Sequence, residues 1–142
     1  MKVYHGATDA PAVDIYADGS LLVENLSFGE YAGYVQVPVG DYTIDVTASG
    51  STVPVASFSA PLSGQGGGAG IVFASGFLAP VDTDPAFTLV LTTPSGYNVE
   101  LPAADPVLVQ TANVQIIHNS PSPIVDIYVD GVEALADVPL SL

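Results

Sequence analysis

The sequence predicts an all-β sandwich, and three observations lead to this prediction. Apolar and polar residues alternate over short stretches, as in residues 13–17 (VDIYA), and this is the period of a half-buried β-strand. The 14 Gly and 12 Pro residues are spread between these stretches, which suits many short strands joined by tight turns. No stretch has the pattern of a long amphipathic helix, and no apolar run is long enough to cross a membrane.

The expected strands follow one another closely along the first part of the chain, as in an immunoglobulin-like antiparallel sandwich with Greek-key-type connections. They are expected at residues 2–5, 11–17, 21–26, 31–37, 42–47, 53–58, 71–74, 87–91 and 97–101, with a linker at 103–106. Pro54 places its strand near a sheet edge, because proline cannot donate a ladder hydrogen bond. The continuous apolar run at 71–74 predicts a central strand.

A nine-residue motif occurs twice. PAVDIYADG at residues 11–19 returns as PIVDIYVDG at residues 123–131, at a constant offset of 112 residues. The shared motif residues are Asp14, Tyr16, Asp18 and Gly19 in the first copy and Asp126, Tyr128, Asp130 and Gly131 in the second. Each copy ends in Asp-Gly, which predicts a two-residue type I′ turn between antiparallel strands.

The repeat divides the chain into a sandwich domain at residues 1–112 and a partial second repeat at 113–142. Two or three strands do not bury a core alone, so the apolar side chains of the second part need a partner. These candidate assembly residues are Ile116, Val125, Ile127, Val129, Leu135 and Val138.

Two interpretations of the second part stay open. In one, it is the start of a further repeat that has been cut short. In the other, its strands complete a sheet in another copy of the chain or pair with their own N-terminal domain. A head-to-tail contact between copies does not close, so it would build a filament.

The charge balance restricts the partners. The chain has 15 acidic residues and a single basic one, Lys2, which gives a net charge of −14. Nucleic acid is excluded as a partner because phosphate binding needs Lys or Arg, and anionic lipid is excluded for the same reason. The acidity suits solubility in a saline habitat, resistance to trypsin-like proteases outside the cell, or cation binding.

Few residues of the sequence are candidate metal ligands. Asp82 and Asp84 form an Asp-x-Asp pair in an expected loop, where carboxylates can bind calcium, but a solvated loop is favoured because no Gly-punctuated series of ligands accompanies them. His5 and His118 precede the two motif strands, where a hydrogen bond that fixes the following loop is favoured over a metal ligand. We expect no other cofactor.

The remaining motifs indicate no catalytic residues. Asp14 and Asp18 share a strand face, but an outward face does not raise a pKa and Asp18 belongs to the turn. The Gly-rich stretch at 64–70 lacks the Lys and Ser/Thr of a phosphate-binding loop, so it is interpreted as a flexible connection. A row of Tyr residues can stack on sugars or a partner protein, or simply favour strands.

A longer pattern of residues extends from the first strand beyond the first copy of the motif. It consists of His5, Asp9, Ala10, Pro11, Val13, Asp14, Tyr16, Asp18, Gly19, Phe28, Gly29, Tyr34, Pro38, Gly40 and Tyr42. With this pattern, residues 3–76 resemble a prokaryotic cell-surface family known as domain of unknown function 4397, and residues 114–138 resemble it again. This resemblance implies an immunoglobulin-like or transthyretin-like sandwich, often in tandem, on secreted or surface-anchored proteins without known enzyme activity. The stretch at 64–70 departs from the family, which has a shorter turn there.

Together, these observations predict a non-enzymatic structural or adhesive module, extracellular or on the cell surface, that assembles with copies of itself by strand complementation. The alternative is a carbohydrate- or calcium-binding accessory module of a larger secreted or surface-anchored protein. Expected partners are other copies of the chain and, in the alternative, surface glycans. Nucleic-acid binding and membrane insertion are not expected.

Overall fold

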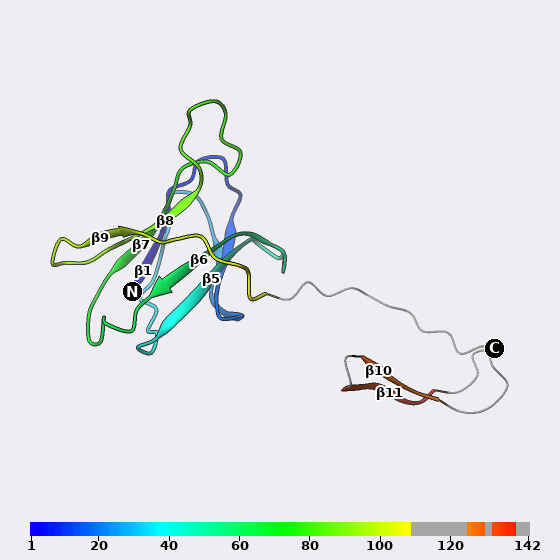
Figure 1. Ribbon diagram of the computed structural model, residues 1–142. Coiled ribbons are helices and arrows are strands. Elements are labelled where there is room, and N and C mark those ends of the chain that lie inside the picture. Colours follow the sequence, from blue (N-terminus) through cyan, green and yellow to red (C-terminus); the bar gives the residue numbers. More distant parts are fainter. Residues whose placement is uncertain (109–124, 130–131, 139–142) are drawn as a thin grey trace. The chain divides into compact units, whose positions relative to one another are not determined.

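The computed structural model describes residues 1–108, 125–129 and 132–138. The chain divides into two compact units, Met1–Gln110 and Thr111–Leu142, which are described separately. The strands of the first unit are β1 (Lys2–His5), β2 (Val13–Ala17), β3 (Ser20–Leu26), β4 (Tyr31–Ala32), β5 (Asp41–Ala48), β6 (Pro54–Pro61), β7 (Ile71–Ser75), β8 (Thr88–Thr92) and β9 (Asn98–Glu100) (Figure 1). Among the described residues there is no helix, which confirms the all-β prediction.

The strands of the first unit form two sheets. One has the order β4-β1-β7-β8-β9 and the other the order β3-β2-β5-β6. Neighbouring strands are antiparallel except β1 and β7, which run parallel with Lys2 opposite Ile71 and His5 opposite Ala74. The β-sandwich is therefore confirmed, with one mixed sheet where purely antiparallel pairing was expected.

The core lies between the two sheets and comes from the apolar positions of the alternating strands. Val13, Ile15 and Ala17 are all buried, as their spacing predicts. Full burial of one large apolar side chain stabilises the fold by about 1.5–3 kcal/mol. The core cluster contains Val3, Val13, Ile15, Ala17, Val23, Leu26, Ile44, Val46, Phe58, Ala60, Leu62, Val72, Ala74, Leu89, Leu91 and Leu101.

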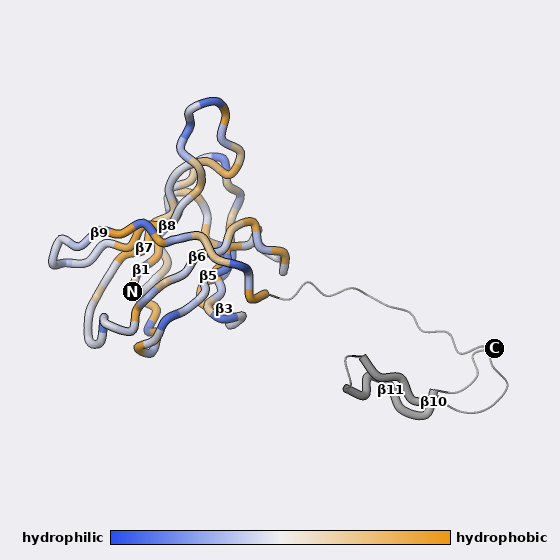
Figure 2. The backbone as a smooth tube through the Cα atoms, viewed as in Figure 1, coloured by the Kyte–Doolittle hydropathy of each residue, from blue (hydrophilic) through white to orange (hydrophobic). Residues whose placement is uncertain are grey.

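Two expectations about strand position are also confirmed. The apolar run in β7 lies between β1 and β8 inside the five-stranded sheet, and β6, which begins at Pro54, is the last strand of its sheet. The loop between β7 and β8 projects from the sandwich and carries hydrophilic residues at its tip (Figure 2).

The motif strand β2 ends in the two-residue turn expected from Asp18-Gly19. Both residues have positive φ, 45° and 79°, and Ala17 lies opposite Ser20 across the turn. The Asp18 carboxylate accepts a hydrogen bond of 2.8 Å from the backbone N–H of Thr43 in β5. The turn is thereby tied to the strand on the other side of β2.

The strand expected at residues 31–37 is shorter in the structure. β4 covers Tyr31–Ala32, and the chain then leaves the sheet to reach β5 in the other one. Val35 still exchanges hydrogen bonds with Met1, at 2.8 and 2.9 Å. Gly33, Gly40 and Pro38 explain the early end, because glycine weakens strand structure and proline lacks the donor.

The prediction of an unpaired linker at 103–106 is wrong for its first residues. These residues pair with the outer edge of β6. Ser59 donates to the carbonyl of Pro102 at 2.8 Å, and Ala104 donates to the carbonyl of Ser57 at 2.9 Å. Ala103 forms a bridge opposite Phe58. The sequence pattern hides this pairing because the segment is short and contains two prolines.

A buried carboxylate holds the next residues in place. Asp45 is completely buried, although the alternation of β5 places it on the outer face of the sheet. Its Oδ2 accepts hydrogen bonds from the N–H groups of Val107 and Leu108, at 3.0 and 2.9 Å. Its Oδ1 accepts one from the hydroxyl of Ser57. The last described residues of the first unit are thus fastened to β5.

The second unit contains a hairpin of β10 (Val125–Val129) and β11 (Val132–Val138). Its cross-strand pairs are Val125–Val138, Ile127–Leu135, Tyr128–Glu133 and Val129–Val132. The β2–β3 hairpin of the first unit has the pairs Val13–Leu26, Ile15–Val23, Tyr16–Leu21 and Ala17–Ser20. The two registers coincide at the offset of 112 residues, including both irregular positions. Ile116, His118, Asp130 and Gly131 lie outside the described residues.

The turn gives a prediction about stability. Gly19→Val should lower the free energy of unfolding by about 1 kcal/mol or more, because a β-branched residue resists positive φ. Gly64→Val is the matched control, since that glycine has no positive φ and a Cβ there meets no atom within 4 Å. Denaturant unfolding of both variants is the measurement, and equal stability would contradict the strained turn.

Candidate functional site

The motif residue Asp14 is a buried structural clamp. Asp14 alternates with the core residues Val13 and Ile15, so it lies on the outer face of β2, but exposure to solvent there is wrong, because the side chain is almost fully covered. Its two carboxylate oxygens accept hydrogen bonds from the N–H of Asn25, at 2.7 Å, and from the N–H of Gly50, at 2.9 Å. Asn25 has a φ of 52° and lies at an irregular position of the β2–β3 ladder. Asp14 therefore fixes this irregularity, and this role was not visible in the alternation.

The surroundings of Asp14 also set its ionisation. Burial raises the pKa of the carboxyl, but the N–H donors of Asn25 and Gly50 and the Ser49 side chain outweigh it and lower the pKa. The carboxylate is the stable form in the folded protein. A carboxyl group whose pKa is lowered in this way is a poor general acid, because it holds no proton to donate near neutral pH.

Two further motif positions have structural roles. Asp9 accepts hydrogen bonds from the N–H groups of Leu78 and Ala79, both at 3.0 Å, which join the loop before β2 to the loop after β7. The backbone donors of Ala79 and Leu78 lower the pKa of this exposed carboxyl. Tyr16 is half-buried and lies opposite Asp45 on β5.

His5 fixes the loop before β2, which is the role favoured by the sequence. The ring is buried, and its Nε2 donates to the carbonyl of Pro11 at 2.9 Å. Its other ring nitrogen, Nδ1, has no hydrogen-bond partner among the described residues. The ring meets Phe28 edge-on, with centroids 6.3 Å apart.

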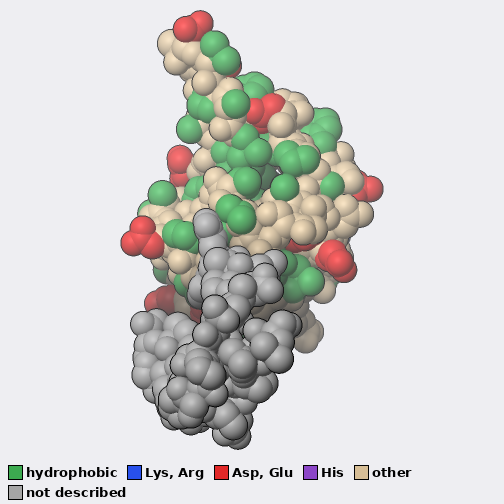
Figure 3. All heavy atoms as spheres, turned by 90° about the vertical axis from the view of Figure 1, so that its right-hand side faces the viewer, with side chains coloured by type: hydrophobic (Ala, Val, Ile, Leu, Met, Phe, Trp, Pro, Cys, Tyr) green, Lys and Arg blue, Asp and Glu red, His purple; other side chains and the backbone are tan. Residues whose placement is uncertain are grey.

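The weak calcium candidates lie in the projecting loop. Asp82 and Asp84 are exposed, and Asp84 accepts a hydrogen bond from the N–H of Val81 within the loop, at 3.4 Å. Within residues 1–108 and the described hairpin, no three His, Cys, Asp or Glu side chains are placed to hold a metal ion together. Asp and Glu side chains lie scattered over the face drawn in Figure 3, with hydrophobic side chains between them.

An open groove of about 610 Å³ runs between β3 and β4, the terminal strands of the two sheets. Tyr31 and Tyr34 line it and are 60% and 72% exposed. The ring of Tyr31 packs on Tyr4 with centroids 4.5 Å apart, and the amino group of Lys2 lies 4.8 Å from the centroid of Tyr34. The groove also contains carboxylates and an amide, from Glu24, Glu30 and Asn25.

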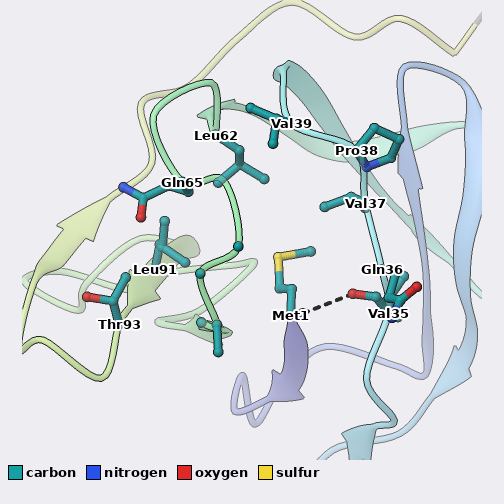
Figure 4. Close-up of a pocket in the computed structure, with 14 residues that line it drawn as sticks. Met1, Val35, Gln36, Val37, Pro38, Val39, Leu62, Gln65, Leu91 and Thr93 are labelled. Atoms are coloured by element: carbon teal, nitrogen blue, oxygen red, sulfur yellow. Dashed lines mark hydrogen bonds between the residues drawn. The ribbon is translucent and has the colours of Figure 1, made fainter.

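A deeper cavity of about 350 Å³ opens at the end of the sandwich where β1 begins (Figure 4). Its walls are formed by two segments that connect one sheet to the other. These are the β4–β5 segment and the Gly-rich segment between β6 and β7. Met1 projects into its centre, and Leu62, Leu91 and Val37 surround it (Figure 4).

The sequence interpretation missed this cavity. The sequence predicts a flexible connection at 64–70, whereas in the structure this segment forms one wall of the cavity. Two glycines shape this segment: Gly67 has a φ of 70°, and a Cβ at Gly68 would lie only 3.0 Å from the backbone oxygen of Gln65. The only sequence feature that marks residues 64–70 as unusual is their departure from the family pattern.

The fold and these surfaces define the first unit as a β-sandwich module in which the sequence motif is structural. The chain belongs to the family described as Domain of unknown function (DUF4397), whose model matches residues 1–105. No curated protein and no solved structure is significantly similar to the chain. Among the described residues, no helix is long and apolar enough to cross a membrane.

The Asp14 clamp predicts a pH-dependent stability. Because the folded-state pKa is lowered, the stability due to Asp14 is present above the unfolded-state pKa, near 4, and is lost as the pH falls through the folded-state pKa. Asp14→Asn should cost about 1–3 kcal/mol at pH 7, since one amide oxygen replaces two acceptors. The difference from the unchanged protein should shrink at pH 3.

Denaturant unfolding at both pH values measures this effect. Asp105→Asn is the control for loss of one negative charge, because that side chain is exposed. A cost of Asp14→Asn that is the same at pH 3 and pH 7 would rule out the charged clamp.

Proposed function

We propose that this chain is a non-enzymatic structural and adhesive module of an extracellular or cell-surface protein. In this proposal, β-sandwich domains follow one another along the chain, and copies join head to tail by β-strand complementation into a surface filament. One observation carries the proposal: the β10–β11 hairpin repeats the register of β2–β3, irregular positions included.

The repeated hairpin needs further strands. In the first unit, β2 has β5 as its second neighbour, so the hairpin forms part of a four-stranded sheet. An isolated two-stranded hairpin is marginally stable in water, and only β10 and β11 pair within the described residues of the second unit. A strand from another copy would supply the missing neighbour.

The apolar side chains favour the same conclusion. Val125, Ile127, Val129, Leu135 and Val138 stand at the positions that Val13, Ile15, Ala17, Val23 and Leu26 occupy in the first repeat, at the offset of 112 residues. All five equivalents in the first repeat are buried in its core. Side chains of this pattern gain stability only when a second sheet layer covers them.

The composition suits a role outside the cell. A single Lys or Arg residue leaves trypsin-like proteases one site of attack. The net charge of −14 keeps copies apart at low salt, and ions screen this repulsion beyond about 10 Å at 0.1 M. Assembly through apolar and backbone contacts should therefore strengthen with ionic strength.

Assembly is tested by comparing the full chain with a variant that lacks residues 114–142. The full chain should form larger species as salt and protein concentration rise, and the shortened chain should stay a folded monomer. Light scattering and negative-stain microscopy measure both. A full chain that stays monomeric at high salt and high concentration would exclude strand complementation and leave the segment as the start of a further tandem domain.

Carbohydrate binding is the second candidate, and the groove between β3 and β4 favours it. Exposed Tyr rings next to carboxylates and an amide are suited to stack on a sugar ring and to bind its hydroxyl groups. This function would make the chain an accessory module of a larger surface protein. It is compatible with tandem domains but does not require assembly.

A glycan array with the purified chain tests the second candidate, with and without added calcium. Saturable binding should be lost in Tyr31→Ala and Tyr34→Ala. Tyr97→Ala is the matched control, because that side chain is 52% exposed and does not line the groove. Absence of binding, or equal loss in all three variants, would count against a sugar site in this groove.

A further inference from the structure

A second, smaller cavity lies on the core side of the cavity at the end of the sandwich. A small inner cavity of about 20 Å³ lies between the sheets and shares Met1, Leu62 and Leu91 with the outer one. Apolar residues alone line the inner cavity, among them Ile44 and Leu101. The outer cavity therefore adjoins an incompletely filled apolar space, with Met1, Leu62 and Leu91 between the two. An apolar group placed against these side chains gains contacts without losing hydrogen bonds.

The lining of the outer cavity has no charged side chain, although the chain carries 15 Asp and Glu residues. Its apolar side chains include Met1, Val37 and Leu91. Its polar side chains are uncharged and come from Gln36, Gln65 and Thr93. Apolar surface with a few polar groups is the usual composition of a small-molecule site, and about 350 Å³ is at the lower end of the usual size.

The charge of the protein selects among apolar ligands. A fatty-acid carboxylate would find no Lys, Arg or His side chain in the cavity lining, and the terminal ammonium group of Met1 already donates a hydrogen bond of 2.9 Å to the carbonyl of Val35. The carboxylate would also meet the negative field of the whole chain. An uncharged head group can instead accept and donate hydrogen bonds at the Gln, Thr and backbone groups of the rim.

From this geometry we infer that the end cavity binds an uncharged amphiphile with a single alkyl chain, such as a fatty alcohol. The alkyl chain lies against Met1, Leu62 and Leu91 and points towards the inner cavity. The hydroxyl group remains at the rim formed by Gln65 and Thr93. This proposal does not rest on strand complementation or on sugar binding, although the Tyr groove shares Val35 with the cavity lining.

Met1 is the single methionine of the chain and lines the cavity, so its methyl group is a direct reporter. The full chain carrying ¹³C-methyl methionine is titrated with decanol and, separately, with decanoate. Decanol should shift the Met1 methyl resonance in a saturable way. Decanoate should bind at least about tenfold more weakly, because of the negative field of the protein.

Two matched variants locate the site. Ala69→Trp places a large side chain in the cavity wall at an exposed position and should abolish saturable binding of decanol. Ala79→Trp makes the same change at an exposed position in the projecting loop and should leave binding unchanged. Circular dichroism of both variants establishes that they are folded.

Phosphatidylcholine vesicles distinguish a free ligand from a lipid surface. The protein should stay in the supernatant when the vesicles are sedimented, because one recessed cavity holds a single chain. Co-sedimentation would overturn the inference of a free ligand. Lack of a saturable shift with decanol, equal affinity for decanoate, or unchanged binding in Ala69→Trp would overturn the site itself.

Discussion

Hydrogen bonds from backbone N–H groups to carboxylates are the interactions on which the rest of this structure depends. A chain with one Lys or Arg and 15 acidic residues has almost no basic side chains to balance buried charge. Asp14 and Asp45 are both buried, and each accepts two backbone N–H donors. Such donors stabilise a carboxylate without any counter-charge, and losing them would leave a costly buried charge.

These carboxylates also join parts of the chain that are distant in sequence. Asp14 connects β2 to the irregular position of β3 and to the turn after β5, and Asp45 connects β5 to residues 107–108. The hydrophobic alternation that builds the sheets does not determine where the connecting loops lie. Asp14 and Asp45 do so, and the role of Asp14 gives the Asp of the first VDIY sequence a structural explanation.

The sequence predicted the strands and the turn well because both depend on local chemistry. Period-two alternation located most strands, and Asp18-Gly19 located a turn that needs positive φ. Contacts between distant segments were not predictable in this way. The burial of Asp14, the pairing of residues 102–104 with β6 and the walls of the end cavity all require the tertiary arrangement.

The position of β1 has a mechanical consequence. This N-terminal strand lies inside its sheet, between β4 and β7, so a force that pulls Met1 along the strand axis must break hydrogen bonds to both neighbours together. Near the C-terminal end of the first unit, residues 102–104 pair with β6, and residues 107–108 donate hydrogen bonds to Asp45. Tension on Met1 along the axis of β1 therefore loads several hydrogen bonds in shear at once, and does not open them one at a time like a zipper.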